Sequence, residues 1–313
     1  MNILFTGVSS FTGAWFAAKL AAAGHHVTAT TRQQRGAYTD VRRVRLNYAA
    51  EAGVDFLECC AFGDRGFMDA LTGTDVVCHH AAEVTNYKSL DFDVADAVRS
   101  NTRNVRQVIE QASQASVRGL IVTGTVSEQD EGLGDAPLRA FSPYALSKGI
   151  SWQIFSFWAG MSKMPIGKFV IPNPFGPLED ERYCAYLVRT WAEGAVARVQ
   201  TPDYVRDNIP VDRLAERYVE FVEAFARQEN NARAAPSGYV ESQGRFTERF
   251  ARELGQRLNL AAKFELTNQT HFAEPIIRIN AEPALAGWDE AGFWDNCAEY
   301  YRRTYLSWWP RRL

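Results

Sequence analysis

The stretch FTGVSSFTGAW, residues 5–15, follows the apolar opening residues 1–4 and leads into an alanine-rich segment. Its glycines, Gly7 and Gly13, lie between a predicted first strand and a predicted first helix. Gly7 suits a tight reversal of the chain, and Gly13 allows the helix to pack closely against the strand. The free N–H groups at the start of such a helix favour a pyrophosphate. The stretch therefore predicts a dinucleotide site after the first strand.

The first half of the chain alternates short apolar strands with helical segments, a pattern typical of an α/β fold with a doubly wound parallel sheet. One long helix is expected over residues 91–115. We predict a Rossmann-type dinucleotide-binding domain over residues 1–170, to which residues 196–228 return. The remaining residues, 171–195 and 229–313, are expected to form a smaller mixed substrate-binding lobe.

Composition limits the partners of this chain. Its 313 residues carry a net charge of −3, so we expect no general attraction to nucleic acid or to a membrane surface. The opening MNILFTG lacks a basic segment, and no run approaches the ~20 apolar residues of a membrane span. Five cysteines without a C-x-x-C spacing indicate reduced thiols, so a cytoplasmic protein is expected. The tail WWPRRL is interpreted as a segment packed on the body.

No metal is expected. The paired histidines at 25–26 and 79–80 are adjacent in strand-like segments. Adjacent side chains of a strand point to opposite faces of the sheet, so such pairs chelate poorly.

Four further segments complete a set of motifs. HHAA is residues 79–82, SNTRNV contains Asn101, PNPFGP is residues 172–177, and RDNIPVDRLA is residues 206–215. Together with the glycine stretch and YALSK, they resemble the extended short-chain dehydrogenase/reductases, the nucleotide-sugar epimerase/dehydratase group. The resemblance spans most of the chain. It implies an NAD(P)-dependent enzyme whose substrate is a nucleotide-diphosphate sugar.

The resemblance also implies which residues form the site. The cofactor residues are Gly7, Ser9, Ser10, Phe11, Thr12, Gly13, Thr31, Arg32, Arg35, Cys60, Ala61, His80, Ala81, Ala82, Tyr144 and Lys148. The catalytic residues are Tyr144, Lys148, Thr125 and Asn101, with Thr123 as the competitor of Thr125. The substrate residues are Val84, Thr85, Thr125, Asn173 and Arg206, and Tyr183 is a candidate to stack on the base. The other interpretation of Arg206 is a salt bridge with Asp207 or Asp212.

The pair Tyr144 and Lys148 carries the expected chemistry. Residues four apart share one face of a helix. A free tyrosine, with a pKa of about 10, is a poor base at neutral pH. A lysine ammonium nearby is expected to lower that pKa. The tyrosine then exchanges a proton with a sugar oxygen while hydride moves to or from the nicotinamide.

Ser10 departs from the family pattern, because it takes the position of the middle glycine. Its side chain holds the backbone further from the phosphates, but its hydroxyl can hydrogen-bond them. We expect cofactor binding with altered geometry, and the alternative is impaired binding.

The second strand indicates the choice of cofactor. Thr31 takes the position of an acidic residue that would bind the adenosine ribose of NAD, and Arg32 follows it. A guanidinium can grip a 2′-phosphate, and Arg35 could assist. We therefore expect a preference for NADP(H), with NAD(H) as the other candidate. The alternative interpretation of Arg32 is a solvent-facing loop charge. Near the adenine, Cys60 replaces the usual aspartate.

These features favour an NADPH-dependent reductase of a nucleotide-linked keto-sugar of the 4-keto-6-deoxyhexose type, active in deoxysugar biosynthesis. Val126 and Ser127 replace the acidic pair of the dehydratases, with Glu128 one residue later, which disfavours dehydration. The alternatives are a nucleotide-sugar 4-epimerase with tightly bound NAD, reduction of a non-sugar carbonyl, and a non-catalytic NADP(H)-binding regulator. A homodimer through helices 91–115 and 143–161 is expected from the resemblance.

Overall fold

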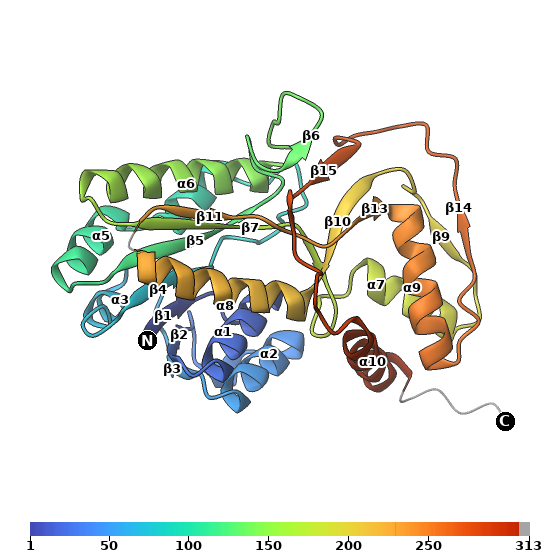
Figure 1. The fold of residues 1–313 in the computed structure, drawn as a ribbon, viewed down its shortest axis with the longest axis horizontal. Coiled ribbons are helices and arrows are strands. Elements are labelled where there is room, and N and C mark those ends of the chain that lie inside the picture. Colours follow the sequence, from blue (N-terminus) through green and yellow to red (C-terminus); the bar gives the residue numbers. More distant parts are fainter. Residues whose placement is uncertain (229, 307–313) are drawn as a thin grey trace.

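The structure, a computed structural model, describes residues 1–228 and 230–306 (Figure 1). The tail WWPRRL, expected to pack on the body, lies outside the described residues. Two parts lie side by side along the longest axis, a larger part built on a parallel sheet and a smaller mixed lobe (Figure 1). This is the α/β, Rossmann-type architecture that the alternating pattern predicted.

A seven-stranded parallel sheet forms the centre of the larger part, in the order β11-β7-β5-β4-β1-β2-β3. Its strands are apolar and mostly buried, as expected of a parallel sheet covered on both faces. The strands are β1 (Asn2–Thr6), β2 (His26–Thr30), β3 (Asp55–Leu57), β4 (Val76–His79), β5 (Gly119–Thr125), β7 (Ile166–Ile171) and β11 (Ala232–Ala234).

Helices cover both faces of this sheet (Figure 1). One face carries α1 (Phe11–Ala22), α2 (Asp40–Glu51) and α8 (Val211–Gln228), and the other carries α3 (Arg65–Asp69), α4 (Val94–Asn101), α5 (Val105–Gln114) and α6 (Pro143–Met161). A hydrophobic core lies on each side. Phe16 stacks on Tyr218 at 4.1 Å in the first core, and Phe62 packs edge-on to Phe155 in the second.

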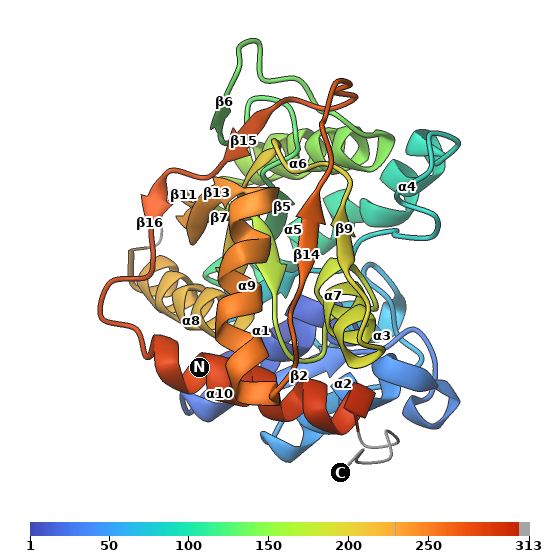
Figure 2. The same cartoon turned by 90° about the vertical axis from the view of Figure 1, so that its right-hand side faces the viewer.

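The smaller lobe contains a second sheet in the order β13-β10-β15-β6, with β8 beside β10, and two two-stranded sheets, β12-β16 and β14-β9. Its helices α7, α9 and α10 enclose a third core around Phe175 and Trp294 (Figure 2). The elements are β6 (Leu133–Gly134), β8 (Asn173–Phe175), α7 (Tyr183–Ala192), β9 (Ala197–Val199), β10 (Val205–Pro210), β12 (Pro236–Ser237), β13 (Tyr239–Ser242), α9 (Gln243–Leu258), β14 (Phe264–Leu266), β15 (Ile277–Ile279), β16 (Glu282–Pro283) and α10 (Glu290–Tyr301).

The connections place the lobe at one edge of the main sheet. β6 follows β5, β8 follows β7 directly, and both join the second sheet. The lobe therefore lies at the carboxyl ends of the parallel strands, where ligands of doubly wound folds bind.

Two sequence-based expectations about the elements are wrong. The helix expected over residues 91–115 is broken into α4 and α5, because Asn104 adopts a left-handed conformation with φ 53°. The Asn104 amide donates to the carbonyl of Gly63, and the missing Cβ of Gly63 lets Arg103 approach. The expected return of residues 196–228 to the main sheet begins only at α8. β9 and β10 pair with strands of the lobe instead, and β11 completes the return.

Within the described residues, no helix is both long enough and apolar enough to cross a membrane.

Candidate active site

The turn after β1 requires both of its glycines. Gly7 has a φ of +87°, and a Cβ there would lie 2.7 Å from the backbone nitrogen of Ala81. A Cβ on Gly13 would lie 2.1 Å from the carbonyl oxygen of Gly7. The start of α1 thus packs directly on the turn. The N–H groups of Phe11 and Thr12 precede the first intrahelical hydrogen bond and are directed outward from the helix start, as a phosphate requires.

The hydroxyl of Ser10 is turned into this loop. It donates to the carbonyl of Gly7 at 2.8 Å and accepts from the N–H of Gly13 at 3.1 Å, so Ser10 is the N-cap of α1. In this structure the hydroxyl is directed at the carbonyl of Gly7, and the expectation that it bonds a phosphate stays a prediction. Ser9 lies beside it and is partly exposed.

His80 links the turn to the neighbouring strands. One ring nitrogen lies 3.1 Å from both the Ser10 and Thr12 hydroxyls, and the other lies 3.0 Å from the Thr123 hydroxyl. Burial and then the charge of Lys148 lower the pKa of His80 to about 3, so the ring is neutral. His79 packs on the opposite face of the sheet, against Phe62 and Phe155. The two histidines thus face apart, as the strand pattern predicted.

Thr31 and Arg32, the two residues that follow β2, differ in burial and in their contacts. Thr31 is buried, and its hydroxyl donates to the carbonyl of Gln33. Arg32 is largely exposed, and its guanidinium lies 3.7 Å from the carboxylate of Glu83, which follows β4. Since β1 lies between β2 and β4, this ion pair spans the end of β1. Arg32 is therefore neither a free cation nor a purely solvent-facing charge.

Arg35 pairs with Glu58 at 3.0 Å and lies over the ring of Phe56. Arg35 follows β2, as Arg32 does, and its charge is paired with the Glu58 carboxylate.

The residues after β3 are enclosed. Cys60 is buried, and burial together with Asp64 raises the pKa of its thiol to about 11. The N–H of Ala61 donates to the Asp64 carboxylate at 2.8 Å. The carboxylate of Asp64, four residues after Cys60, therefore closes this turn.

Tyr144 projects from the first turn of α6 into an aromatic group. Its ring lies 5.5 Å from that of Tyr87 and 6.1 Å from that of Phe92, both edge-on. Burial, then Glu128 and Tyr87, raise the pKa of Tyr144 above its usual value, and Arg182 opposes them. The predicted lowering of this pKa is therefore wrong for this structure, because burial and a nearby carboxylate outweigh any effect of the lysine.

Lys148 is buried one turn along α6 from Tyr144. Burial lowers the pKa of its ammonium to about 8, and the charge of Glu128 opposes this shift. Lys148 is close enough to His79 and His80 to lower the pKa of each imidazole.

Thr125 is the last residue of β5. Its hydroxyl lies 3.0 Å from the hydroxyl of Ser127, and Thr125 is only partly buried. Thr123 is buried and bonded to His80, so Thr125 is the better placed of the two for a substrate oxygen.

The loop after β4 is fixed by Asn101 and Glu83. The Asn101 side chain accepts from the N–H of Glu83 at 2.7 Å and reaches Ser151 of α6 at 3.4 Å. The Glu83 carboxylate accepts in turn from the N–H groups of Val84 and Thr85. Ala81 and Ala82 line the start of this loop and are partly exposed. Asn101 therefore supports the loop on which the expected substrate residues stand.

The lobe presents the remaining predicted residues. Asn173 of β8 is exposed, and its amide donates to Asn208 at 2.5 Å. Arg206 of β10 pairs with Glu274 at 2.9 Å and donates to backbone carbonyls. The alternative pairing of Arg206 with Asp207 or Asp212 is wrong, since both point elsewhere.

Tyr183 bonds through its hydroxyl to Thr247 of α9 at 2.5 Å. This contact fixes the ring within the lobe, between α7 and α9.

Three residues near Tyr144 were not found in the sequence. The ring of Tyr87 packs against that of Tyr144, and the guanidinium of Arg182 lies 5.4 Å from the Tyr87 ring. Glu128 is fully buried. The sequence pattern marks Glu128 only as an acidic residue one position after the place of the dehydratases' acidic pair. Arg182 belongs to a charged loop that gave no motif.

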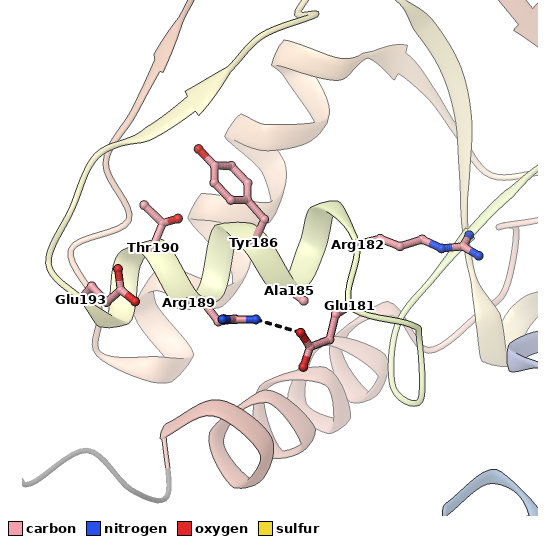
Figure 3. A pocket seen from close by; sticks show the side chains of 7 residues that line it. All are labelled: Glu181, Arg182, Ala185, Tyr186, Arg189, Thr190 and Glu193. Carbon is pink, nitrogen blue, oxygen red and sulfur yellow. Dashed lines mark hydrogen bonds and ion pairs between the residues drawn. The ribbon is translucent and has the colours of Figure 1, made fainter. Parts of the chain in front are cut away.

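A surface depression of about 350 Å³ lies over α7, lined by Glu181, Arg182, Ala185, Tyr186, Arg189, Thr190 and Glu193 (Figure 3). Glu181 and Arg189 form an ion pair across it. Figure 3 shows Arg182 pointing away from the other labelled side chains. Arg182 thus stands at the border of this depression, and its guanidinium reaches the ring of Tyr87.

No group of three or more His, Cys, Asp or Glu side chains in the described ranges is arranged to hold a metal ion.

The parallel sheet, the glycine turn and the Tyr144–Lys148 face of α6 define the class of Rossmann-fold enzymes that bind a nicotinamide dinucleotide. The chain belongs to the NAD dependent epimerase/dehydratase family, whose model matches residues 3–233. A comparison with curated protein sequences finds no match.

Solved structures share the fold. A UDP-glucuronic acid 4-epimerase from Bacillus cereus, in complex with UDP-glucuronic acid and NAD, covers 97% of this chain and 100% of its own, with TM-score 0.76 and 15% identity. A dTDP-glucose 4,6-dehydratase from Streptomyces venezuelae, with NAD bound, covers 99% of both chains, with TM-score 0.72 and 16% identity. A UDP-glucose 4-epimerase from Thermotoga maritima covers 97% and 99%, with TM-score 0.69 and 18% identity. At these identities the likeness concerns the fold.

Proposed function

We propose that this protein is an NADPH-dependent reductase of a nucleotide-linked keto-sugar, of the 4-keto-6-deoxyhexose type used in deoxysugar biosynthesis. The observation that carries the proposal is the state of Tyr144. Burial and Glu128 raise the pKa of its phenol, which favours the protonated form, and the hydroxyl of Thr125 at the end of β5 is only partly buried. A protonated phenol is the form that can give a proton to a carbonyl oxygen, which is what reduction of a ketone requires.

The residues at the carboxyl edge fit a dinucleotide. The N–H groups at the start of α1 suit a pyrophosphate, and the residue directly after β2 is a threonine rather than an acid that would repel a 2′-phosphate. Arg32 is exposed beside that position. When bound, the nicotinamide supplies the hydride that reduces the carbonyl carbon.

The side chains of the protein do the rest of the work. The Thr125 hydroxyl orients the substrate carbonyl, and the Tyr144 phenol donates its proton to the carbonyl oxygen. Lys148 stabilises the phenolate that is left, because an ammonium nearby favours the charged form. Asn173 and Arg206 lie on the neighbouring strands β8 and β10 of the lobe, and a guanidinium suits a diphosphate. Arg206 would then exchange Glu274 for the diphosphate.

The test measures oxidation of NADPH and of NADH against a panel of nucleotide keto-sugars. We expect turnover with NADPH to exceed turnover with NADH. Tyr144→Phe should lower kcat by about 10²–10⁴, the usual worth of a positioned acid or base, and should leave NADPH binding within about twofold. Full turnover by Tyr144→Phe would contradict the role given to Tyr144. Absence of turnover in the wild type, with a biological activity that survives Tyr144→Phe, would favour the non-catalytic regulator.

A 4-epimerase with tightly bound NAD is the second candidate. One observation favours it: Arg32 is held by Glu83 and is not free for a 2′-phosphate. Two of the solved structures with this fold are also named as 4-epimerases. Purified protein that carries stoichiometric NAD, and that interconverts C4 epimers without added cofactor, would establish this function instead.

We also propose that the protein is a homodimer through the outer face of α6. Leu146, Ile150, Phe157 and Met161 are exposed apolar residues on this helix, and their spacing of four, seven and four places them on one face.

A further inference from the structure

The catalytic edge contains a buried group of charged side chains around Glu128, of which the proposed chemistry uses only the effect of Glu128 on Tyr144. Glu128 is fully buried, and one carboxylate oxygen accepts from the N–H of Thr125 at 2.8 Å. The other oxygen accepts from the ammonium of Lys168 at 2.6 Å. Lys168 stands in the middle of β7 and is itself buried, so this pair lies inside the main sheet rather than on its surface.

The pair is built into the fold at several points. A Cβ on Gly124 would lie 2.6 Å from Cε of Lys168 and 3.1 Å from the Glu128 carboxylate, so only glycine admits both side chains. The ring of Trp152 lies 5.0 Å from the Lys168 ammonium. Lys168 also donates to Glu131 at 2.7 Å, and Glu131 accepts from Arg233 at 2.5 Å. A series of ion pairs thus runs from the partly exposed Arg233 through Glu131 and Lys168 to Glu128. The Glu128 carboxylate in turn accepts from the N–H of Thr125.

The loop after β5 is fixed from the lobe side as well. Arg278 of β15 is buried and donates to the backbone carbonyls of Glu128 and Glu131. In the segment from Thr125 to Glu131, the Glu128 carboxylate is therefore held by Lys168, and the Glu128 and Glu131 carbonyls are held by Arg278. These contacts restrict the positions of Thr125 and Ser127. Burying a charge is costly unless it is paired, and here Glu128 and Glu131 are both paired with Lys168, while Arg278 is held by backbone carbonyls.

We propose that Glu128 is a positioning residue of the active site: its carboxylate fixes the backbone of Thr125 and supplies the negative charge that balances the buried ammonium of Lys148. The inference rests on the proposed function for its meaning in catalysis. The charged and titratable groups around Lys148 are Glu128 from the loop after β5, Lys168 from β7, His79 and His80 from β4, and Tyr144 from its own helix. Both histidines are neutral, so Glu128 is the one negative charge among these groups.

The first test needs no substrate. The chain has six lysines, at 19, 88, 148, 163, 168 and 263, so ¹³Cε-lysine NMR gives few signals, and Lys148→Arg assigns the one of interest. In the wild type this signal should titrate near pH 8. In Glu128→Gln the midpoint should fall by about 0.5 to 1 pH unit, because a nearby negative charge no longer favours the ammonium.

Glu131→Gln is the matched control. It removes the other carboxylate on Lys168 but not the one that acts on Lys148, so its midpoint should stay with the wild type. An unshifted Lys148 signal in folded Glu128→Gln would overturn the inference, and so would an equal shift in both variants.

The second test uses the keto-sugar reduction. Glu128→Gln should lower kcat by at least about tenfold with KM within about twofold, and its kcat should fall with increasing pH from a lower midpoint than in the wild type, because the active ammonium form of Lys148 is lost at lower pH. If no nucleotide sugar is turned over by the wild type, the proposed function fails while the NMR result still decides the inference.

If Glu128→Gln does not fold, the double variant Glu128→Gln/Lys168→Gln replaces the ion pair by two amides that can bond each other. It should show a smaller shift in the same direction, since the effect of Glu128 on Lys148 exceeds the opposing effect of Lys168. No shift in this folded variant would count against the inference.

Discussion

At the scale of single residues, the turn after β1 is held by polar side chains that bond one another. Ser10 bonds Gly7 and Gly13, and His80 reaches Ser10, Thr12 and Thr123. These contacts join the helix start to two strands. They leave the backbone N–H groups, rather than the serine hydroxyl, to receive a phosphate.

Ser10→Gly tests this division of roles. Replacing an N-cap serine by glycine costs only a few tenths of a kcal/mol, so the melting temperature should change by about 2 °C or less. Fluorescence titration with NADPH should show an affinity equal to or higher than that of the wild type, because the backbone can approach the phosphates more closely. Ser10→Ala, which also lacks the hydroxyl but keeps the Cβ, is the control. A tenfold weaker affinity in both variants would show that the hydroxyl binds phosphate.

The resemblance to the family named Tyr144, Lys148 and Thr125 as one site, because its motifs are short local stretches. In the structure Thr125 ends β5, and Tyr144 and Lys148 lie in the first turns of α6. Tyr87 and Arg182 could not be found in this way, since each stands in a loop whose position depends on packing. The direction of the Tyr144 pKa shift was missed for the same reason, because burial cannot be read from a four-residue spacing.

At the scale of elements, the loop between β8 and α7 is fastened to the helices of the main sheet. Trp15 of α1 donates to the carbonyl of Pro177 at 2.9 Å. Arg45 of α2 is buried and donates twice to the carbonyl of Leu178, which has a positive φ of 71°. The lobe is thereby tied to the dinucleotide side of the molecule. The next residue, Glu179, has a buried carboxylate oxygen that lacks a partner among the described residues.

This buried acid predicts a pH-dependent stability. Burial raises the pKa of Glu179 from 4.5 to about 7. The folded protein therefore binds more protons than the unfolded chain between these values, so the free energy of unfolding falls as pH rises through that window. Glu179→Gln cannot ionise, and its melting temperature should exceed that of the wild type by about 2 °C or more at pH 8 and approach it at pH 4.5. Glu181→Gln, at an exposed position nearby, is the control. A constant difference across pH would refute this assignment.

The order of strands and helices in the first half followed from periodicity, because apolar runs and helical spacing are local signals. The break at Asn104 did not, since it depends on contact with Gly63, forty-one residues earlier. The return to the main sheet was placed too early for a related reason. A short strand such as β10 carries no sign of which sheet it will join.

At the scale of the whole molecule, α6 serves two surfaces. Its inner face brings Tyr144 and Lys148 to the carboxyl edge, and its outer face exposes Phe157 and Met161, with 58% and 68% of their surface accessible. A parallel sheet covered on both faces needs only the inner side of such a helix for its core. Covering the outer apolar residues therefore requires a partner surface. In a two-fold dimer, the outer faces of α6 from two copies of the chain can cover each other.

Phe157→Glu tests the proposed dimer. A charge placed in the centre of an apolar interface cannot be paired by the identical residue of the second copy, so association should be lost. Light scattering coupled to size exclusion should show a dimer for the wild type and a 35.1 kDa monomer for the variant. Val240→Glu, an equally polar change at an exposed apolar residue of β13 in the lobe, should remain dimeric. Since Phe157 does not face the cleft, NADPH binding should persist in the monomer. A wild type that is monomeric at micromolar concentration would refute the dimer, and a dimeric Phe157→Glu would move the interface to another face.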